Sequence, residues 1–180
     1  EADRRRMLEV NTIGTAACAS HAVSAMLKQG TPASIINVTS GSQAGDIALG
    51  GYGASKAAVA SFTYTWAMEL KATNVRVNAI SPLALTAMAR SNMQFLALQS
   101  ASSEVVYTTL PDPADSAPVV TFLISDASIG ITGQVIRIAG NQLSYVTHPM
   151  IAHPVLEGKW THESVEEAFR ERLGREQRRL

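Results

Sequence analysis

The chain has 180 residues and 46% of them are hydrophobic, so it is long enough for one domain with a proper core. Its 15 basic and 15 acidic side chains balance. This balance argues against nucleic acid and anionic membranes as partners, because both favour a basic protein surface. No apolar run approaches the roughly 20 residues of a membrane span, and the first residues are too polar for a signal peptide. We therefore expect a cytoplasmic protein without a membrane segment.

The cysteine and histidine content points to no redox or metal chemistry. Cys18 is the only cysteine, so we expect a small buried hydrophobe in a reduced intracellular protein. The four histidines are scattered without ligand spacing, and we expect no metal site.

Helical and strand patterns alternate along the chain. Apolar residues at three- and four-residue spacing predict helices, and short runs of branched residues predict buried strands. Proline cannot donate to a sheet ladder, so Ser81-Pro82 is expected to end the second strand. Asp112 is expected to cap the helix that begins at Pro113. The predicted elements are helices over 3–28, 52–72, 86–102, 113–125 and 164–173, strands over 34–39, 75–80 and 134–139, a glycine-rich loop over 40–51 and a loop over 142–161.

This order of elements predicts an α/β fold. Strands that are separated by helices of such length imply parallel crossover connections. A parallel sheet of three strands has exposed edges that need to be covered or paired. We therefore expect that the chain does not stand alone.

Tyr52 and Lys56 form the most informative pair of side chains. They are four residues apart at the start of a predicted helix, so one turn places both on the same face. A phenol ordinarily has a pKa of about 10, and a neighbouring ammonium stabilises the phenolate. Tyr52 is thus a candidate general acid and base. Ser40, at the end of the preceding strand, can hydrogen-bond a substrate oxygen where charge develops.

Several segments together resemble the short-chain dehydrogenase/reductase family. They are Asn37-Val38-Thr39-Ser40, Tyr52-x-x-x-Lys56 with Ala54-Ser55 between, Arg76-Val77-Asn78-Ala79-Ile80-Ser81-Pro82, Asn11-Thr12-Ile13-Gly14 and Ile131-Thr132-Gly133-Gln134-Val135-Ile136. They occur in the family's order and cover residues from about 3 to 141.

The resemblance implies a role for each matching residue. Tyr52 is the catalytic acid/base, Lys56 binds the nicotinamide ribose and tunes Tyr52, Ser40 orients the substrate, and Asn11 supports a proton-relay water. Thr39 or Ser42 is an alternative to Ser40, and Asn11 has the alternative of only bridging backbone groups. The residues that would line the nicotinamide end of the cofactor are Pro82, Leu83 and Thr86.

The largest departure from the family is the lack of its glycine-rich turn and of its Asn-Asn-Ala-Gly segment. In the family those parts carry most of the dinucleotide site, because backbone amides at a helix N-terminus hold the pyrophosphate. The residue that selects NAD or NADP follows the second strand of the same missing half, so the choice between the two is not readable. The resemblance therefore implies a partial Rossmann-like fold, a doubly wound parallel sheet in three αβα layers, truncated at the N-terminus. Residues 1–141 would be the catalytic portion and 142–180 a C-terminal extension.

The resemblance predicts an NAD(P)-dependent oxidoreductase that interconverts a secondary alcohol and a ketone. The alternative is a truncated, non-catalytic subunit that serves assembly. A homodimer or homotetramer is implied, with the further option of a partner that supplies the missing half. The segment 87–110 would cover the substrate, and its apolar residues suggest an apolar or acyl-type substrate.

Overall fold

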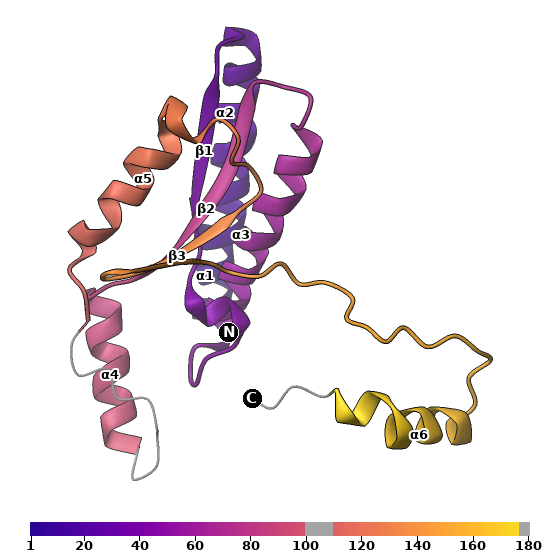
Figure 1. Ribbon diagram of the computed structural model, residues 1–180. Helices are drawn as coiled ribbons and strands as arrows, with labels where there is room; N and C mark the ends of the chain where they lie inside the picture. The colour runs from indigo at the N-terminus through magenta and orange to yellow at the C-terminus, as the bar shows by residue number, and fades with distance from the viewer. Residues whose placement is uncertain (100–109, 177–180) are drawn as a thin grey trace. The chain divides into compact units, whose positions relative to one another are not determined.

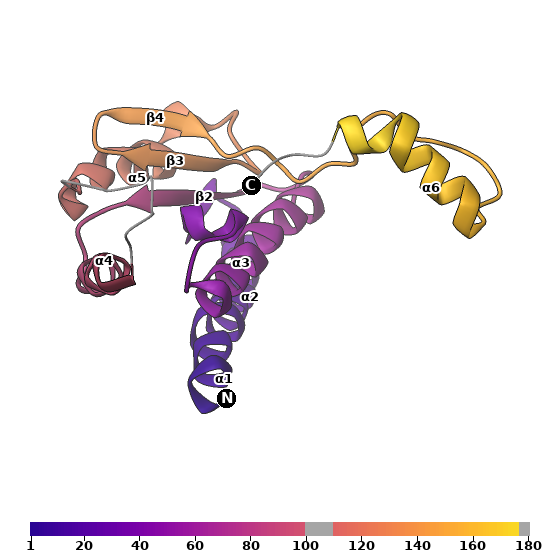
Figure 2. The same cartoon turned by 90° about the horizontal axis from the view of Figure 1, so that it is seen from below.

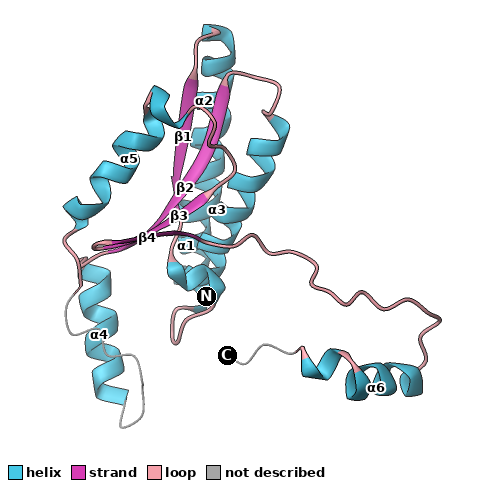
Figure 3. Cartoon of the chain, in the orientation of Figure 1, coloured by secondary structure: helices cyan, strands magenta, loops and turns pink. Residues whose placement is uncertain are grey.

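A computed structural model describes residues 1–99 and 110–176, which form two compact units, Glu1–Val146 and Thr147–Leu180. Figures 1 and 3 show the helices and strands along the chain. The helices are α1 (Ala2–Leu8), α2 (Gly14–Gln29), α3 (Gly50–Glu69), α4 (Ala87–Gln99), α5 (Ala117–Ile124) and α6 (His162–Glu171), and the strands are β1 (Ala33–Val38), β2 (Val75–Leu83), β3 (Val135–Ala139) and β4 (Gln142–Tyr145).

The sheet of the first unit has the strand order β1-β2-β3-β4. The pairs β1/β2 and β2/β3 are parallel, and β4 pairs antiparallel with β3. Figure 2 shows β4 beside β3. The carboxyl ends of the three parallel strands therefore meet at one edge of the sheet, where open α/β sheets bind ligands.

Helices cover both faces of this sheet, as the α/β prediction required. In Figure 1, α2 and α3 lie on one face of the strands and α5 lies on the other. Successive strand residues point to opposite faces, so β2 and β3 each contribute to two separate cores. The core cluster on the α3 face contains the buried residues Ala60, Ala79 and Val135, and the core cluster on the α5 face contains Ile80, Leu123 and Ile136.

Two strand predictions were wrong. β2 does not end before Pro82 but continues to Leu83, and Pro82 is the register partner of Ile138. β1 stops pairing at Val38, opposite Ile80. Among the described residues, β3 is therefore the one strand neighbour of β2 at Pro82, and a residue without an N–H can be accommodated there. β4 lies in a segment that was predicted to be a loop, and all its residues are exposed.

The predicted helix over 3–28 is interrupted. A π-helical turn, Glu9–Ile13, separates α1 from α2 and contains Asn11. π turns inside α-helices carry an extra residue and occur frequently at functional sites. Cys18, on α2, is exposed and not buried as predicted, and the buried residue at this point of the helix is its neighbour Ala19.

The remaining helices differ from the predictions mainly at their ends. The predicted cap is confirmed, since Asp112 Oδ1 accepts a hydrogen bond of 2.8 Å from the backbone N–H of Ala114. A 3-10 turn, Pro113–Ser116, precedes α5. The predicted end of the helix at Ser102 and residues 100–109 of the predicted substrate segment lie outside the described residues.

The second unit contains α6, which begins at His162, two residues before the predicted start. Thr161 and Ser164 cap it reciprocally: Thr161 Oγ1 accepts from the Ser164 N–H at 3.3 Å, and Ser164 Oγ accepts from the Thr161 N–H at 2.8 Å. In the part of the chain that the structure describes, no helix combines the length and the apolarity needed to cross a membrane.

Candidate active site

Tyr52 and Lys56 share one face of the first turns of α3. Lys56 Nζ lies 5.8 Å from the centre of the Tyr52 ring. Its ammonium also donates a hydrogen bond of 2.9 Å to the carbonyl oxygen of Val38, the last residue of β1. Both side chains are partly exposed. The lysine is thus held between the end of a strand and the tyrosine, as their four-residue spacing predicted.

Burial alters the proton affinity of Lys56. Desolvation by the surrounding protein disfavours the charged form, and this lowers the pKa of the Lys56 ammonium from its usual value. The Lys56 ammonium therefore holds its proton less tightly than an exposed lysine does.

Ser40 begins a chain of hydroxyl hydrogen bonds that ends on a carboxylate. It caps the 3-10 turn Gly41–Ala44, and its Oγ accepts from the Ser42 N–H at 3.2 Å. The Ser40 hydroxyl donates to Ser42 Oγ at 3.3 Å, and the Ser42 hydroxyl donates to Asp46 Oδ2 at 2.9 Å. Ser40 is partly exposed, whereas Ser42 is buried. These hydrogen bonds hold the Ser42 side chain in place and leave the Ser40 hydroxyl accessible.

A close backbone approach joins the Ser40 turn to the start of α3. A Cβ placed on Gly53 would lie 2.4 Å from the carbonyl oxygen of Ser42, a distance that real Cβ atoms do not adopt. Only glycine fits at this position. The residue next to Tyr52 is therefore in contact with the turn that Ser40 caps.

Asn11 reaches the site through one intermediate residue. Its side-chain amide donates to Ser55 Oγ at 3.1 Å, and Ser55 Oγ donates to the carbonyl oxygen of Tyr52 at 2.7 Å. The carbonyl oxygen of Asn11 accepts from Thr15 Oγ1 at 2.7 Å. Asn11 is thus connected to the backbone of Tyr52, and not to its hydroxyl.

Pro82, Leu83 and Thr86 lie at and beyond the carboxyl end of β2. Pro82 and Leu83 are partly exposed strand residues, while Thr86 is exposed in the turn before α4. Thr86 Oγ1 accepts a hydrogen bond of 3.1 Å from the Ala89 N–H, so it caps α4. In the described part of the chain, no hydrogen bond joins these residues to Tyr52.

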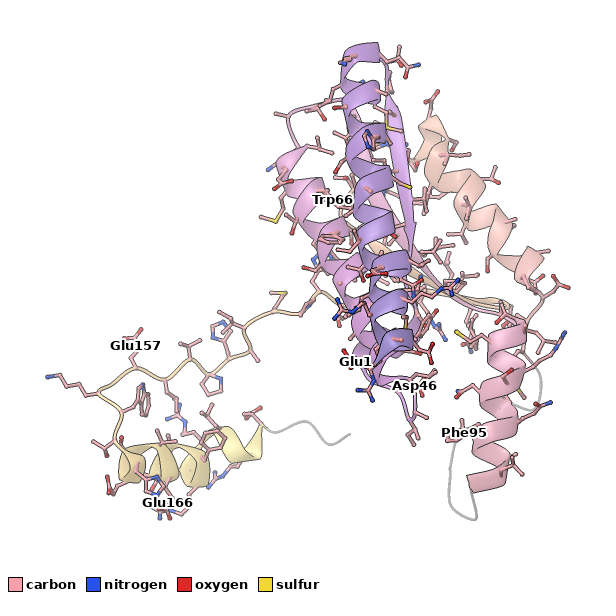
Figure 4. All side chains as sticks on the ribbon, turned by 180° about the vertical axis from the view of Figure 1, so that it is seen from behind. Glu1, Asp46, Trp66, Phe95, Glu157 and Glu166 are labelled. Atoms are coloured by element: carbon pink, nitrogen blue, oxygen red, sulfur yellow. The ribbon has the colours of Figure 1, made fainter. Side chains whose placement is uncertain are left out.

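An open cleft of about 310 Å³ separates α4 from the loop before α3. Figure 4 shows Phe95 on the side of α4 toward the loop that carries Asp46. Ala48, in that loop, has a φ of 62°, a left-handed conformation that is unfavourable for residues other than glycine. The residues that line the cleft are Ala48, Leu49, Met88, Ser91, Asn92 and Phe95.

The sequence did not single out Ser55, Asp46 or Ala48. Ser55 lies inside the Tyr52-x-x-x-Lys56 segment, so its position was visible but its bond to Asn11 was not. Asp46 follows Ser42 by four residues in a glycine-rich loop, where spacing says little about contacts. The left-handed Ala48 has no sequence signal.

The chain is similar to several known proteins. A family model described as enoyl-(acyl carrier protein) reductase matches residues 1–140. The chain is 36% identical over 139 residues to NADPH-dependent aldehyde reductase 2, chloroplastic, of Arabidopsis thaliana, and the match covers 77% of this chain and 51% of that protein. It is 36% identical over 141 residues to the 3-oxoacyl-(acyl-carrier-protein) reductase FabG of Thermotoga maritima, covering 78% of this chain and 57% of that protein.

The fold is also found in solved structures. An NAD+-bound xylitol dehydrogenase aligns with a TM-score of 0.69 and 29% identity, over 78% of this chain and 60% of that one. The chain spans about half the length of the curated relatives it matches.

Proposed function

Because the chain belongs to the short-chain dehydrogenase/reductase family, we propose that it interconverts a secondary alcohol and a ketone by NAD(P)-dependent hydride transfer. The observation that carries this proposal is the position of the Lys56 ammonium, 5.8 Å from the Tyr52 ring at the start of α3. Both groups lie where the carboxyl ends of the parallel strands meet, since Lys56 bonds the last carbonyl of β1.

The donor set of Lys56 fits the nicotinamide ribose. An ammonium carries three donors, and the Val38 carbonyl is the one acceptor that the described residues provide for Lys56. The remaining donors suit ribose hydroxyl oxygens. The cofactor, NAD or NADP, would supply the hydride. Pro82, Leu83 and Thr86 are proposed to line its nicotinamide end.

Tyr52 is proposed to move the proton of the reaction. Its hydroxyl gives a proton to the carbonyl oxygen in reduction and accepts it from the alcohol in oxidation, while the Lys56 ammonium stabilises the phenolate. The bond from Ser55 to the Tyr52 carbonyl holds the backbone of the first turn in place, and Asn11 holds Ser55. Asn11 is therefore proposed as a positioning residue that also supports a relay water.

Ser40 is proposed to orient the substrate oxygen. The alternatives fit less well, because the Thr39 hydroxyl is buried and donates to the Ile80 carbonyl at 3.0 Å, and the buried Ser42 hydroxyl donates to Asp46. The partly exposed Ser40 hydroxyl can turn from Ser42 to a ligand at the cost of one long hydrogen bond.

The substrate is proposed to be apolar or acyl-type in the part that faces α4. Support comes from the cleft between α4 and the loop before α3, whose lining includes Leu49, Met88 and Phe95. A relative that is named for 3-oxoacyl reduction agrees with such a substrate.

Replacement of Tyr52 by phenylalanine tests the function. We expect turnover of ketones with NADH or NADPH, followed by nicotinamide absorbance, to fall by about 10²–10⁴-fold, the usual contribution of a general acid. The matched control is Tyr145→Phe on exposed β4, which should retain full activity. Full activity of Tyr52→Phe would refute the proposed role.

A non-catalytic assembly subunit is the second candidate. It is favoured by β1, whose one strand partner among the described residues is β2. A further chain that supplies the other half, or a homodimer or homotetramer, would pair that edge or cover exposed apolar residues such as Leu8, Val10, Ile13 and Met68. Fluorescence titration with NADH and NADPH separates the candidates, because micromolar binding argues against the non-catalytic one.

A further inference from the structure

We propose that Arg137 is an anion-recognition residue that selects substrates with a carboxylate one or two carbons from the reacting carbonyl. The inference rests on the proposed oxidoreductase function, because the anion belongs to the substrate of that site. It concerns a strand residue that the proton-transfer mechanism does not use.

The sheet register places Arg137 level with the catalytic end of β1. Arg137 pairs with Ser81, one step beyond the last β1/β2 pair, Val38 and Ile80. Val135, two residues earlier on the same strand, packs against Ala60 of α3. Because strand residues two apart share a face, Arg137 lies on the face of the sheet that α3 covers. This is also the face that carries Lys56.

The guanidinium extends across β2 to the turn after β1. Arg137 Nη1 donates a hydrogen bond of 3.2 Å to the Ser81 carbonyl oxygen. A Cβ placed on Gly41 would lie 3.3 Å from the same nitrogen and 3.7 Å from Cζ. Gly41 follows Ser40 directly, and consecutive Cα atoms are about 3.8 Å apart. A group bound by Arg137 would therefore lie close to a carbonyl bound by Ser40.

Among the described residues, the Arg137 guanidinium has no charged partner. Within residues 1–99 and 110–176, its one hydrogen bond is to the neutral Ser81 carbonyl, and no ion pair involves it. The carboxylate nearest in sequence to the turn, Asp46, accepts from Ser42. The Ser81 hydroxyl and Gln43 Oε1 are buried polar atoms that lack a protein partner in the described part of the chain. Arg137 is only partly buried, so a ligand can reach it.

Guanidinium chemistry specifies the ligand. Arginine presents five donors in a planar fork that fits a carboxylate with two parallel hydrogen bonds. One donor is used by Ser81, so the others remain for the ligand. With Ser40 on the carbonyl and Arg137 on the carboxylate, the geometry suits a 2-oxo or 3-oxo acid and the matching hydroxy acid.

Direct binding of a small probe tests this without cofactor or turnover. Acetoacetate, a 3-oxo carboxylate, is titrated into the isotope-labelled chain, and amide shifts of Gly41 and Arg137 are followed by NMR. Methyl acetoacetate, which has the same ketone and no charge, is the control ligand. We expect saturable binding of acetoacetate and at least tenfold weaker binding of the ester.

Three variants and one control sharpen the test. Arg137→Gln should weaken acetoacetate binding at least tenfold, and Arg137→Lys, which keeps the charge but not the planar fork, should give an intermediate loss. Gly41→Ala should displace the guanidinium and weaken binding without changing the charge. Arg170→Gln on α6 is the charge-matched control and should bind as the parent does. Thermal unfolding checks that each variant folds. If Arg137→Gln does not fold, the binding of acetoacetate to Arg137→Lys decides whether the guanidinium is needed.

The outcomes distinguish this inference from the proposed function. Equal binding of ester and acid, no binding of acetoacetate to the parent chain, or unchanged binding by Arg137→Gln and Arg137→Lys would overturn the role of Arg137. If acetoacetate binds through Arg137 but no NAD(P)H-dependent turnover occurs, the anion site stands and the oxidoreductase proposal fails.

Discussion

The side-chain amide of Asn11 donates a 3.1 Å hydrogen bond to the hydroxyl of Ser55, which is 44 positions away and fully buried. The bond connects the π turn between α1 and α2 to the second turn of α3. The Ser55 hydroxyl in turn donates a hydrogen bond to the Tyr52 carbonyl oxygen. The conformation of the π turn and the position of the proposed proton donor are therefore coupled.

Removal of either partner should reveal this coupling. We expect Asn11→Ala to lower the free energy of unfolding by about 1 kcal/mol, the usual net value of one hydrogen bond. Urea unfolding of Asn11→Ala, Ser55→Ala and the double variant gives the coupling energy, which we expect at about 0.5–1 kcal/mol. Strictly additive single effects would show that the two side chains do not interact.

Gly53 should not tolerate any side chain. Gly53→Ala forces a Cβ against the backbone carbonyl of Ser42, which no side-chain rotation can relieve. We expect a loss of about 1–3 kcal/mol in the free energy of unfolding, as for overpacked sites. Gly50→Ala is the matched control in the same helix, because nothing lies within 4 Å of its Cβ position. It should be neutral or stabilising, since alanine favours helices over glycine.

Ala48 should gain from replacement by glycine. Its φ of 62° is strained for alanine and not for glycine. Glycine also raises the entropy of the unfolded chain, which offsets part of the gain. We expect Ala48→Gly to raise the free energy of unfolding by about 0.5 kcal/mol. Thermal unfolding should then show a higher melting temperature than that of the parent. A lower melting temperature would contradict the strain.

The lowered pKa of Lys56 predicts a pH dependence of stability. Between that pKa and the unfolded lysine value of about 10.4, the unfolded chain binds more protons, so stability rises with pH. At lower pH both states hold the proton, and the full cost of a buried charge opposes folding. The urea concentration at the unfolding midpoint is measured for the parent and for Lys56→Met. The difference, parent minus variant, should increase with pH in the alkaline range. Lys28→Met controls for the loss of one charge, and a flat difference would count against desolvation.

Much of the fold was predictable because its core elements have strong local patterns. The branched residues of β1, β2 and β3 predicted buried strands, and their separation by helices predicted the α/β layers. β4 was missed because all its residues are exposed and it has no buried face to detect. Pro82 was misread because proline usually ends a strand, whereas β3 is the one strand neighbour of β2 at that point among the described residues.

The candidate site was predictable only where one element determines the geometry. The four-residue spacing of Tyr52 and Lys56 was enough to place them on one face. The bond between Asn11 and Ser55 joins two elements, and the π turn that presents Asn11 has no pattern of its own. The roles of the site residues, the cytoplasmic location and the oligomeric state remain predictions.

The π turn also determines the rotational phase of the helix that precedes it. Met7 and Arg4 of α1 lie beside Gly51, and a Cβ placed on that glycine would be 3.7 Å from Met7 Sδ. Each residue of an α-helix turns the chain by about 100°. If the five residues Glu9–Ile13 formed an α-helical turn instead, Met7 would rotate away from α3, although every side chain of α1 would be retained. Loss of one residue would remove the extra residue of the π turn and leave Met7 on the same side. A single deletion should therefore be better tolerated in this segment than a single insertion.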